Sequence, residues 1–187
     1  ELIAFDTGPG NALIDDAARK HFNCQFDASG KIASKGQVDY NIVDKVMSDE
    51  YFNQKYPKSL DRNRFKYLMN FLDNHSPEDI ISTLTYITSA SIACAIKALP
   101  KPPELIVICG GGIKNVQMLI WLKSILLSQD ITCMVENISA IGSFDSDYVE
   151  SQAFAYLTAR FFKKLPSTFP STTGAKVANI CGCLVHI

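Results

Sequence analysis

The sequence predicts an α/β fold in which a mixed sheet is flanked by helices, and two stretches of the chain carry this prediction. Residues 104–135 read as an apolar strand, a glycine turn, a periodic helix and a second apolar strand, the order of a βαβ unit. Near the start, an apolar run over 2–5 ends in a turn with two glycines and leads into a helical pattern over 12–22. Because no repeat or linker divides the chain, we expect a single domain over residues 1–187.

The longest predicted helix covers residues 77–99. Ser76 is placed as its N-cap, Pro77 suits its first turn, and Pro100 stops it. The continuous apolar run over 104–109 is typical of a strand buried on both faces of a mostly parallel sheet. Weaker patterns predict helices over 40–52, 64–72, 115–127 and 148–163, a loop or small hairpin over 23–36, and strands over 132–135 and 178–185.

The composition limits the classes of function. The 187 residues are 47% hydrophobic and 20% charged, with a formal net charge of −1, as in ordinary soluble globular proteins. No basic surface is expected, so neither nucleic acid nor an anionic membrane is an expected partner. The longest apolar stretch, 87–99, is interrupted by polar residues and falls short of the ~20 residues of a membrane span. With no secretory pattern at the start, we expect a cytoplasmic protein.

The cysteines and histidines do not form a recognisable metal site. Six cysteines lie scattered through apolar segments without a CxxC pair, which predicts buried, reduced thiols. The three histidines lack the spacing of metal ligands. We therefore predict no metal site built from protein ligands.

The first candidate site is the segment 6–11, which reads Asp6, Thr7, Gly8, Pro9, Gly10 and Asn11. A carboxylate at the end of a strand, followed by two glycines, lies beside free N–H groups and the start of a helix. Anionic oxygens and Mg²⁺ commonly bind at such places, and a general base for phosphoryl transfer would need the same position. Taken alone, an aspartate that caps its own turn is the simpler interpretation.

The second candidate site is the turn Gly110, Gly111 and Gly112, followed by Asn115. Three glycines after a buried strand let the backbone approach a flat or phosphorylated ligand, and the next helix offers its positive end. The turn lacks both the dinucleotide fingerprint and the Gly-Lys-Ser/Thr of a P-loop, which disfavours an oxidoreductase of the Rossmann type. A purely structural turn explains the glycines equally well.

Two further groups could contact a substrate. Asp147 and Glu150 stand on one face at a helix start, where they could bind sugar hydroxyls or simply favour the helix dipole. Lys58 and Arg62 lie in a polar loop that could meet an anionic group or could be an ordinary solvated connection.

The order and spacing of these motifs resemble the anhydro-N-acetylmuramic acid kinases, enzymes of bacterial cell-wall recycling. The resemblance covers nearly the whole chain. It rests on residues 4–15, Pro57 to Ser59 with Phe65, Gly110 to Gly112 with Asn115, Glu150 with 153–155, and Thr173 to Ala175.

The resemblance implies an actin-like kinase fold in which two α/β domains close on ATP and Mg²⁺. It also implies the reaction: O6 of 1,6-anhydro-N-acetylmuramate is phosphorylated while water opens the anhydro bridge, giving N-acetylmuramate 6-phosphate and ADP. The implied roles are Asp6 as the base that activates the water, Thr7, Gly8, Gly10 and Asn11 at the phosphates, Gly110, Gly111, Gly112 and Asn115 at the nucleoside, and Glu150, with Asp147 and Lys58, at the sugar.

Two departures from the family pattern set expectations for this chain. The family's Pro-Lys-Ser-Thr-Gly-Arg-Glu is replaced over 57–63 by Pro-Lys-Ser-Leu-Asp-Arg-Asn, and the family's phosphate loop of the Gly-Thr-Ser-x-Asp-Gly type has no match. We therefore expect the C-terminal half of a kinase, with little or no turnover alone, that self-associates or pairs with a separate N-terminal half. The alternative is a non-catalytic remnant that binds nucleotide or amino sugar.

Overall fold

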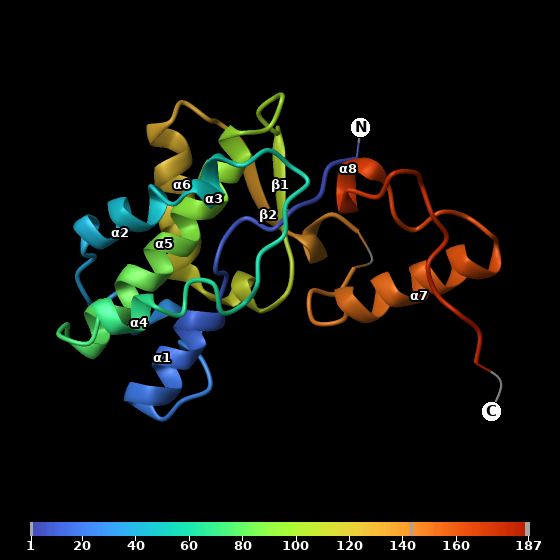
Figure 1. Ribbon diagram of the computed structural model, residues 1–187. Coiled ribbons are helices and arrows are strands. Elements are labelled where there is room, and N and C mark those ends of the chain that lie inside the picture. Colours follow the sequence, from blue (N-terminus) through green and yellow to red (C-terminus); the bar gives the residue numbers. More distant parts are fainter. Residues whose placement is uncertain (1, 143, 186–187) are drawn as a thin grey trace.

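The centre of the fold is the long helix α5 (Pro77–Lys97). In the computed structural model, which describes residues 2–142 and 144–185, it contacts α1 (Ala12–Phe22), α2 (Tyr40–Met47), α3 (Glu50–Asn53) and α6 (Val116–Ser128). Figure 1 shows these helices gathered around α5. Most of the buried apolar residues belong to this bundle, so the bundle is a rigid support for the loops and turns that pack on it.

The start of α5 is confirmed as the sequence predicts. The hydroxyl of Ser76 accepts a hydrogen bond from the amide of Asp79 (3.2 Å), and Pro77 occupies the first turn. Buried hydroxyls within the helix donate to the preceding turn, as Thr85 Oγ1 does to the carbonyl of Ile81 (2.7 Å). Because these side chains are small and their hydroxyls are hydrogen-bonded within the helix, neighbouring helices can approach α5 on several sides.

Most of the apolar stretch 87–99 forms the second half of α5. By length and composition alone, the 21 residues of α5 could cross a membrane. Within the structure, 72% of its most apolar window is buried, as in the core helix of a globular protein. Its apolar character is explained by packing against the surrounding helices.

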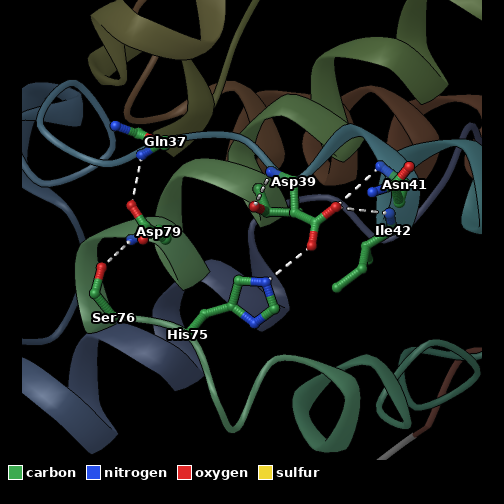
Figure 2. Close-up of polar contacts among 8 residues, drawn as sticks. Gln37, Asp39, Asn41, Ile42, His75, Ser76 and Asp79 are labelled. Carbon is green, nitrogen blue, oxygen red and sulfur yellow. Dashed lines mark hydrogen bonds and ion pairs between the residues drawn. The ribbon is translucent and has the colours of Figure 1, made fainter.

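The N-terminus of α2 is fastened to the N-terminus of α5 (Figure 2). Asp39 caps α2 by accepting from Asn41 (2.9 Å), and its second carboxylate oxygen lies 2.9 Å from Nε2 of His75. A second contact joins the same two segments, in which the carboxylate of Asp79 accepts from the amide of Gln37 (2.6 Å). Two carboxylates therefore join segments that are about forty positions apart in the chain.

The predicted βαβ unit is present. Strands β1 (Leu105–Ile108) and β2 (Met134–Asn137) are parallel, with α6 between them and Leu105 paired with Met134. Ile106 and Ile108 pack on a small core formed by α5 and α6. Burial on both faces was expected and is wrong, because Leu105 is 38% exposed.

Several other element predictions need correction within the described residues. No strand forms over 2–5 or 178–185, and the second of these segments makes only an isolated bridge, Thr168 to Asn179. The helix predicted over 40–52 divides into α2 and α3, because Asp49 caps a new helix. That predicted over 64–72 shortens to α4 (Leu68–Phe71). Residues 28–30 (η1), 111–114 (η2) and 138–140 (η3) are 3₁₀ turns.

The C-terminal region lies to one side of the helical bundle. It contains α7 (Val149–Phe162) and the short α8 (Pro170–Thr173), which Figure 1 shows in orange and red. No residue of α7 is buried in the described structure. The six cysteines were expected to be buried, but three are partly exposed and three are exposed, and all six are unpaired.

Candidate functional site

The segment 6–11 is laid against α5. The hydroxyl of Thr88 donates to the carbonyl of Gly10 (2.9 Å). Gly8 faces Ser91 so closely that a Cβ on Gly8 would lie 2.4 Å from its Oγ. Gly10 has φ +59°, a conformation that glycine adopts without strain. The two glycines of the motif thus serve a close helix contact and a turn, and they bring Asn11 to the start of α1.

Asp6 lies beside the loop that follows α3. Its amide donates to the carbonyl of Lys58 (3.1 Å), and its Oδ2 accepts from the amide of Leu60 (2.7 Å). The hydroxyl of Tyr51 donates to the carbonyl of Asp6 (2.6 Å). The residue itself is exposed. The carboxylate is therefore fixed by the protein on one oxygen while it faces solvent.

Lys58 has protein partners within reach. Its Nζ donates to the carbonyl of Tyr51 (2.8 Å), lies 3.4 Å from that of Phe52, and stands 4.5 Å from the centre of the Tyr51 ring. Partial burial lowers the pKa of this amino group, with a smaller opposing effect from Cys94. The expected contact between Lys58 and the sugar stays a prediction, and the geometry points the side chain at α3.

A first cavity of about 220 Å³ lies between the start of α1, η1 and η2. Lys114 and Asp15 bring opposite charges to it, and burial raises the pKa of the Asp15 carboxyl, with Arg19 and Arg62 acting in the opposite direction and Asp16 in the same one. Phe26, which is 56% exposed, adds a flat apolar surface. The lining residues are Asn11, Ile14, Asp15, Phe26, Asp27, Gly111, Lys114 and Asn115.

Asn115 is buried at the edge of this cavity and caps α6. Its Oδ1 accepts from the amide of Met118 (3.0 Å), so the expected nucleoside contact would have to come from its Nδ2. Gly112 lies close to Asn11, since a Cβ at Gly112 would be 3.7 Å from Asn11 Nδ2. The structure thus brings the first motif and the triple glycine together at Asn11.

A second cavity of about 300 Å³ also borders the triple glycine, at Gly110 and Gly111. Asp147, in the turn before α7, and Glu150, in the first turn of the helix, both line this cavity, although Asp147 does not lie on the helix as predicted. Asp147 also accepts from Nζ of Lys114 (2.8 Å), and both side chains are more than half exposed. The lining residues are Cys109, Gly110, Gly111, Ser146, Asp147, Val149 and Glu150.

Gly111 lines both cavities, whereas Asp6 lines neither of them. Of the predicted residues, Asn11, Gly111 and Asn115 line the first cavity, and Gly110, Gly111, Asp147 and Glu150 line the second. Asp6 and Lys58 lie beside each other and line neither cavity. Sequence reasoning missed Phe26 and Asp27, which come from a stretch without regular periodicity. Lys114 could have been found, because it directly follows the glycine turn.

Among residues 2–142 and 144–185, no group of three or more His, Cys, Asp or Glu side chains is arranged to hold a metal ion. The carboxylates of Asp15 and Asp27 line the first cavity, whereas Asp6 lies outside it.

Comparison with known proteins decides the family. The family model described as anhydro-N-acetylmuramic acid kinase matches residues 1–186. The chain belongs to the anhydro-N-acetylmuramic acid kinase family. Curated relatives with that name are 41% identical over 185 residues in Rhodopseudomonas palustris (strain HaA2), 42% over 185 residues in Bradyrhizobium diazoefficiens, and 34% over 175 residues in Roseobacter denitrificans.

The chain spans about half the length of these relatives. The matched regions cover 99%, 99% and 94% of the chain, but only 48%, 48% and 45% of the respective relatives. The expected resemblance to this family is thus confirmed. The expected position in the C-terminal half of the kinase is not borne out by these comparisons and is withdrawn.

Proposed function

We propose that this chain carries nucleotide-binding and catalytic residues of an anhydro-N-acetylmuramic acid kinase with an actin-like fold. The proposed enzyme is cytoplasmic and uses ATP and Mg²⁺ to convert 1,6-anhydro-N-acetylmuramate into N-acetylmuramate 6-phosphate. Family membership supports the reaction class. The shared lining of two cavities by Gly111 is the structural observation that carries the proposal.

The two cavities differ in a way that suits the two substrates. The first offers the Phe26 ring, the Lys114 cation and bare glycine backbone, which fit a purine base and phosphates. The second offers the carboxylates of Asp147 and Glu150, which fit sugar hydroxyls. A phosphoryl group at Gly111 would lie between nucleotide and sugar.

The start of α1 supports a phosphate position. The N-termini of α2, α5 and α6 are capped by side chains, whereas Asn11 makes no such capping bond to α1. The N–H groups in the first turn of α1 are therefore available to an anion, and the helix dipole favours negative charge at this end of the helix. Thr7, Gly8 and Gly10 would shape this side of the site.

We propose Asp6 as the general base. Its carboxylate would take a proton from water as the water oxygen bonds to the anomeric carbon and the C1–O6 bond breaks. O6 then bonds to the γ-phosphorus of ATP, and ADP leaves. Mg²⁺ would neutralise charge on the phosphate oxygens. The remaining work of the chain is to orient the two substrates.

The test is ADP release by the full-length gene product in the presence of ATP, Mg²⁺ and 1,6-anhydro-N-acetylmuramate. Sugar-dependent release is expected, and Asp6→Asn should reduce it by roughly 10²-fold or more, because the variant cannot accept the proton. Asp61→Asn is the matched control, since Asp61 is an exposed carboxylate of the neighbouring loop that accepts from the amide of Asn63 (2.8 Å). Mg-ATP binding without sugar-dependent turnover would instead identify a non-catalytic binding protein.

A further inference from the structure

Asp6 is held at three points by two neighbouring segments. Its amide and its carboxylate both bond to the backbone of the loop, at the Lys58 carbonyl (3.1 Å) and the Leu60 amide (2.7 Å). Its carbonyl accepts from the Tyr51 hydroxyl (2.6 Å). Backbone and side chain are thus fixed together, which restricts both the position and the rotation of the carboxylate.

The groups that hold Asp6 are themselves rigid. Tyr51 is 3% exposed and packs edge-on against the rings of Phe52 and Phe65. Lys58 ties the loop back to α3 through its bond to the carbonyl of Tyr51. The hydroxyl and the loop therefore cannot move independently, and α3, the loop and Asp6 form one unit.

We propose that Tyr51 and the segment 58–60 form a positioning clamp for Asp6, in which Lys58 braces the clamp and does not contact the sugar. This inference rests on the proposed function, because it assumes that Asp6 acts on the substrate. One carboxylate oxygen is fixed by Leu60, and Oδ1 has no hydrogen-bond partner in the described part of the chain. Oδ1 is then the oxygen that takes the proton.

The clamp also explains the unusual loop sequence. The contact with the carboxylate comes from the backbone amide of Leu60 and not from its side chain. The Leu60 side chain packs against the core and is not the group that holds the carboxylate. The side chains of Asp61 and Asn63 are free to differ, because neither bonds to Asp6.

Kinetics of the full-length gene product separate a clamp from a sugar ligand. Tyr51→Phe removes one hydroxyl, and Lys58→Met keeps the apolar stem but removes the brace. Both should lower kcat by roughly tenfold to a hundredfold and leave KM for the sugar within about twofold. Tyr67→Phe, at a ring that is 40% exposed, is the matched control and should keep the wild-type kcat. A raised KM with unchanged kcat in Lys58→Met would overturn the proposal.

Amide hydrogen exchange tests the clamp without any activity measurement. The Asp6 amide should exchange roughly tenfold faster in Tyr51→Phe than in the wild type, while Tyr67→Phe, which removes a hydroxyl that does not bond to Asp6, should leave its exchange rate unchanged. Equal rates in wild type and Tyr51→Phe would overturn the clamp. If the wild type released no ADP, the proposed function would fail, and the exchange result would still decide whether the clamp exists.

Discussion

The glycines around the candidate site meet different physical requirements. A Cβ at Gly8 would collide with Ser91, so this glycine is needed for the approach of the segment 6–11 to α5. A Cβ at Gly111 would meet nothing within 4 Å, and its φ does not require glycine. The absence of a side chain at Gly111 is therefore not explained by the packing of the described chain, and a ligand at this position would explain it.

This difference predicts that alanine at the two positions affects stability unequally. Gly8→Ala should lower the free energy of unfolding by about 1–3 kcal/mol, because the added methyl forces Ser91 and its helix to shift. Gly111→Ala should change it by less than about 0.5 kcal/mol. Urea denaturation followed by circular dichroism measures both values. Equal losses in the two variants would show that the turn at Gly111 is structurally constrained.

A second prediction concerns Phe26 in the first cavity. Phe26→Ala should weaken Mg-ATP binding by about tenfold, since stacking of a base on an aromatic ring contributes about 1–3 kcal/mol. Stability should change little, because the side chain is 56% exposed. Fluorescence titration with a labelled ATP analogue measures the affinity. Phe71→Ala, at a ring 47% exposed and outside both cavities, is the matched control.

Among the helices and strands, the sequence predicted correctly those features that depend on residues close together in the chain. The N-cap of α5 and the order of the βαβ unit follow from neighbouring residues, and both are confirmed. The strand expected over 2–5 is absent because a strand also needs a partner, and the described chain supplies only the bond between Asp6 and Lys58. Exposed and partly buried residues still alternate over 2–5, although the segment forms no hydrogen-bonded ladder with a second strand.

The candidate site was predictable only in part for a similar reason. The glycine turns and Asp6 are visible as motifs, because each lies within a few residues. The contact of Asp6 with Leu60 joins positions 54 residues apart, and no pattern in the sequence encodes it. Lys58 was assigned to the substrate for the same reason, since its partner on α3 became visible only in the structure.

The junction of α2 and α5 leads to a prediction about pH. The hydrogen bond from His75, followed by those from the amides of Ile42 and Asn41, lowers the pKa of Asp39 below its ordinary 3.8. A carboxyl whose pKa is lower in the folded state than in the unfolded state stabilises the fold at any pH above the unfolded-state pKa. This contribution is lost as the pH falls through the folded-state pKa. Asp39→Asn keeps a capping side chain but removes the charge next to His75.

We predict that Asp39→Asn lowers the free energy of unfolding by about 1 kcal/mol at pH 7. The difference from wild type should vanish as the pH falls well below 3.8, where the wild-type carboxyl is also neutral. Urea unfolding over a pH series measures it, with Asp73→Asn at an exposed ion pair as the control that should have little effect. A difference that does not depend on pH would contradict the linkage.

At the scale of the whole molecule, the C-terminal region exposes apolar surface. Phe154 is 70% exposed and Phe162 64%, and both lie on α7, which buries no residue in the described structure. An isolated helix of 14 residues is marginal in water without tertiary packing. Contiguous apolar surface of this kind favours association.

We predict that the chain self-associates through this surface. Light scattering should give a mass above that of one chain, and the double variant Phe154→Ser with Phe162→Ser should shift the population toward the monomer. Leu127→Ser, at a side chain 68% exposed on α6, is the control that should not. A monodisperse wild-type monomer at high concentration would contradict this prediction.

Calorimetric titration with Mg-ATP measures whether the triple-glycine turn receives a nucleotide. We predict saturable binding to one site, weakened at least roughly tenfold in Gly111→Ala and unchanged in Gly142→Ala, where a Cβ makes only ordinary contacts with Phe144. Equal affinities in wild type and Gly111→Ala, or no binding by the wild type, would contradict it.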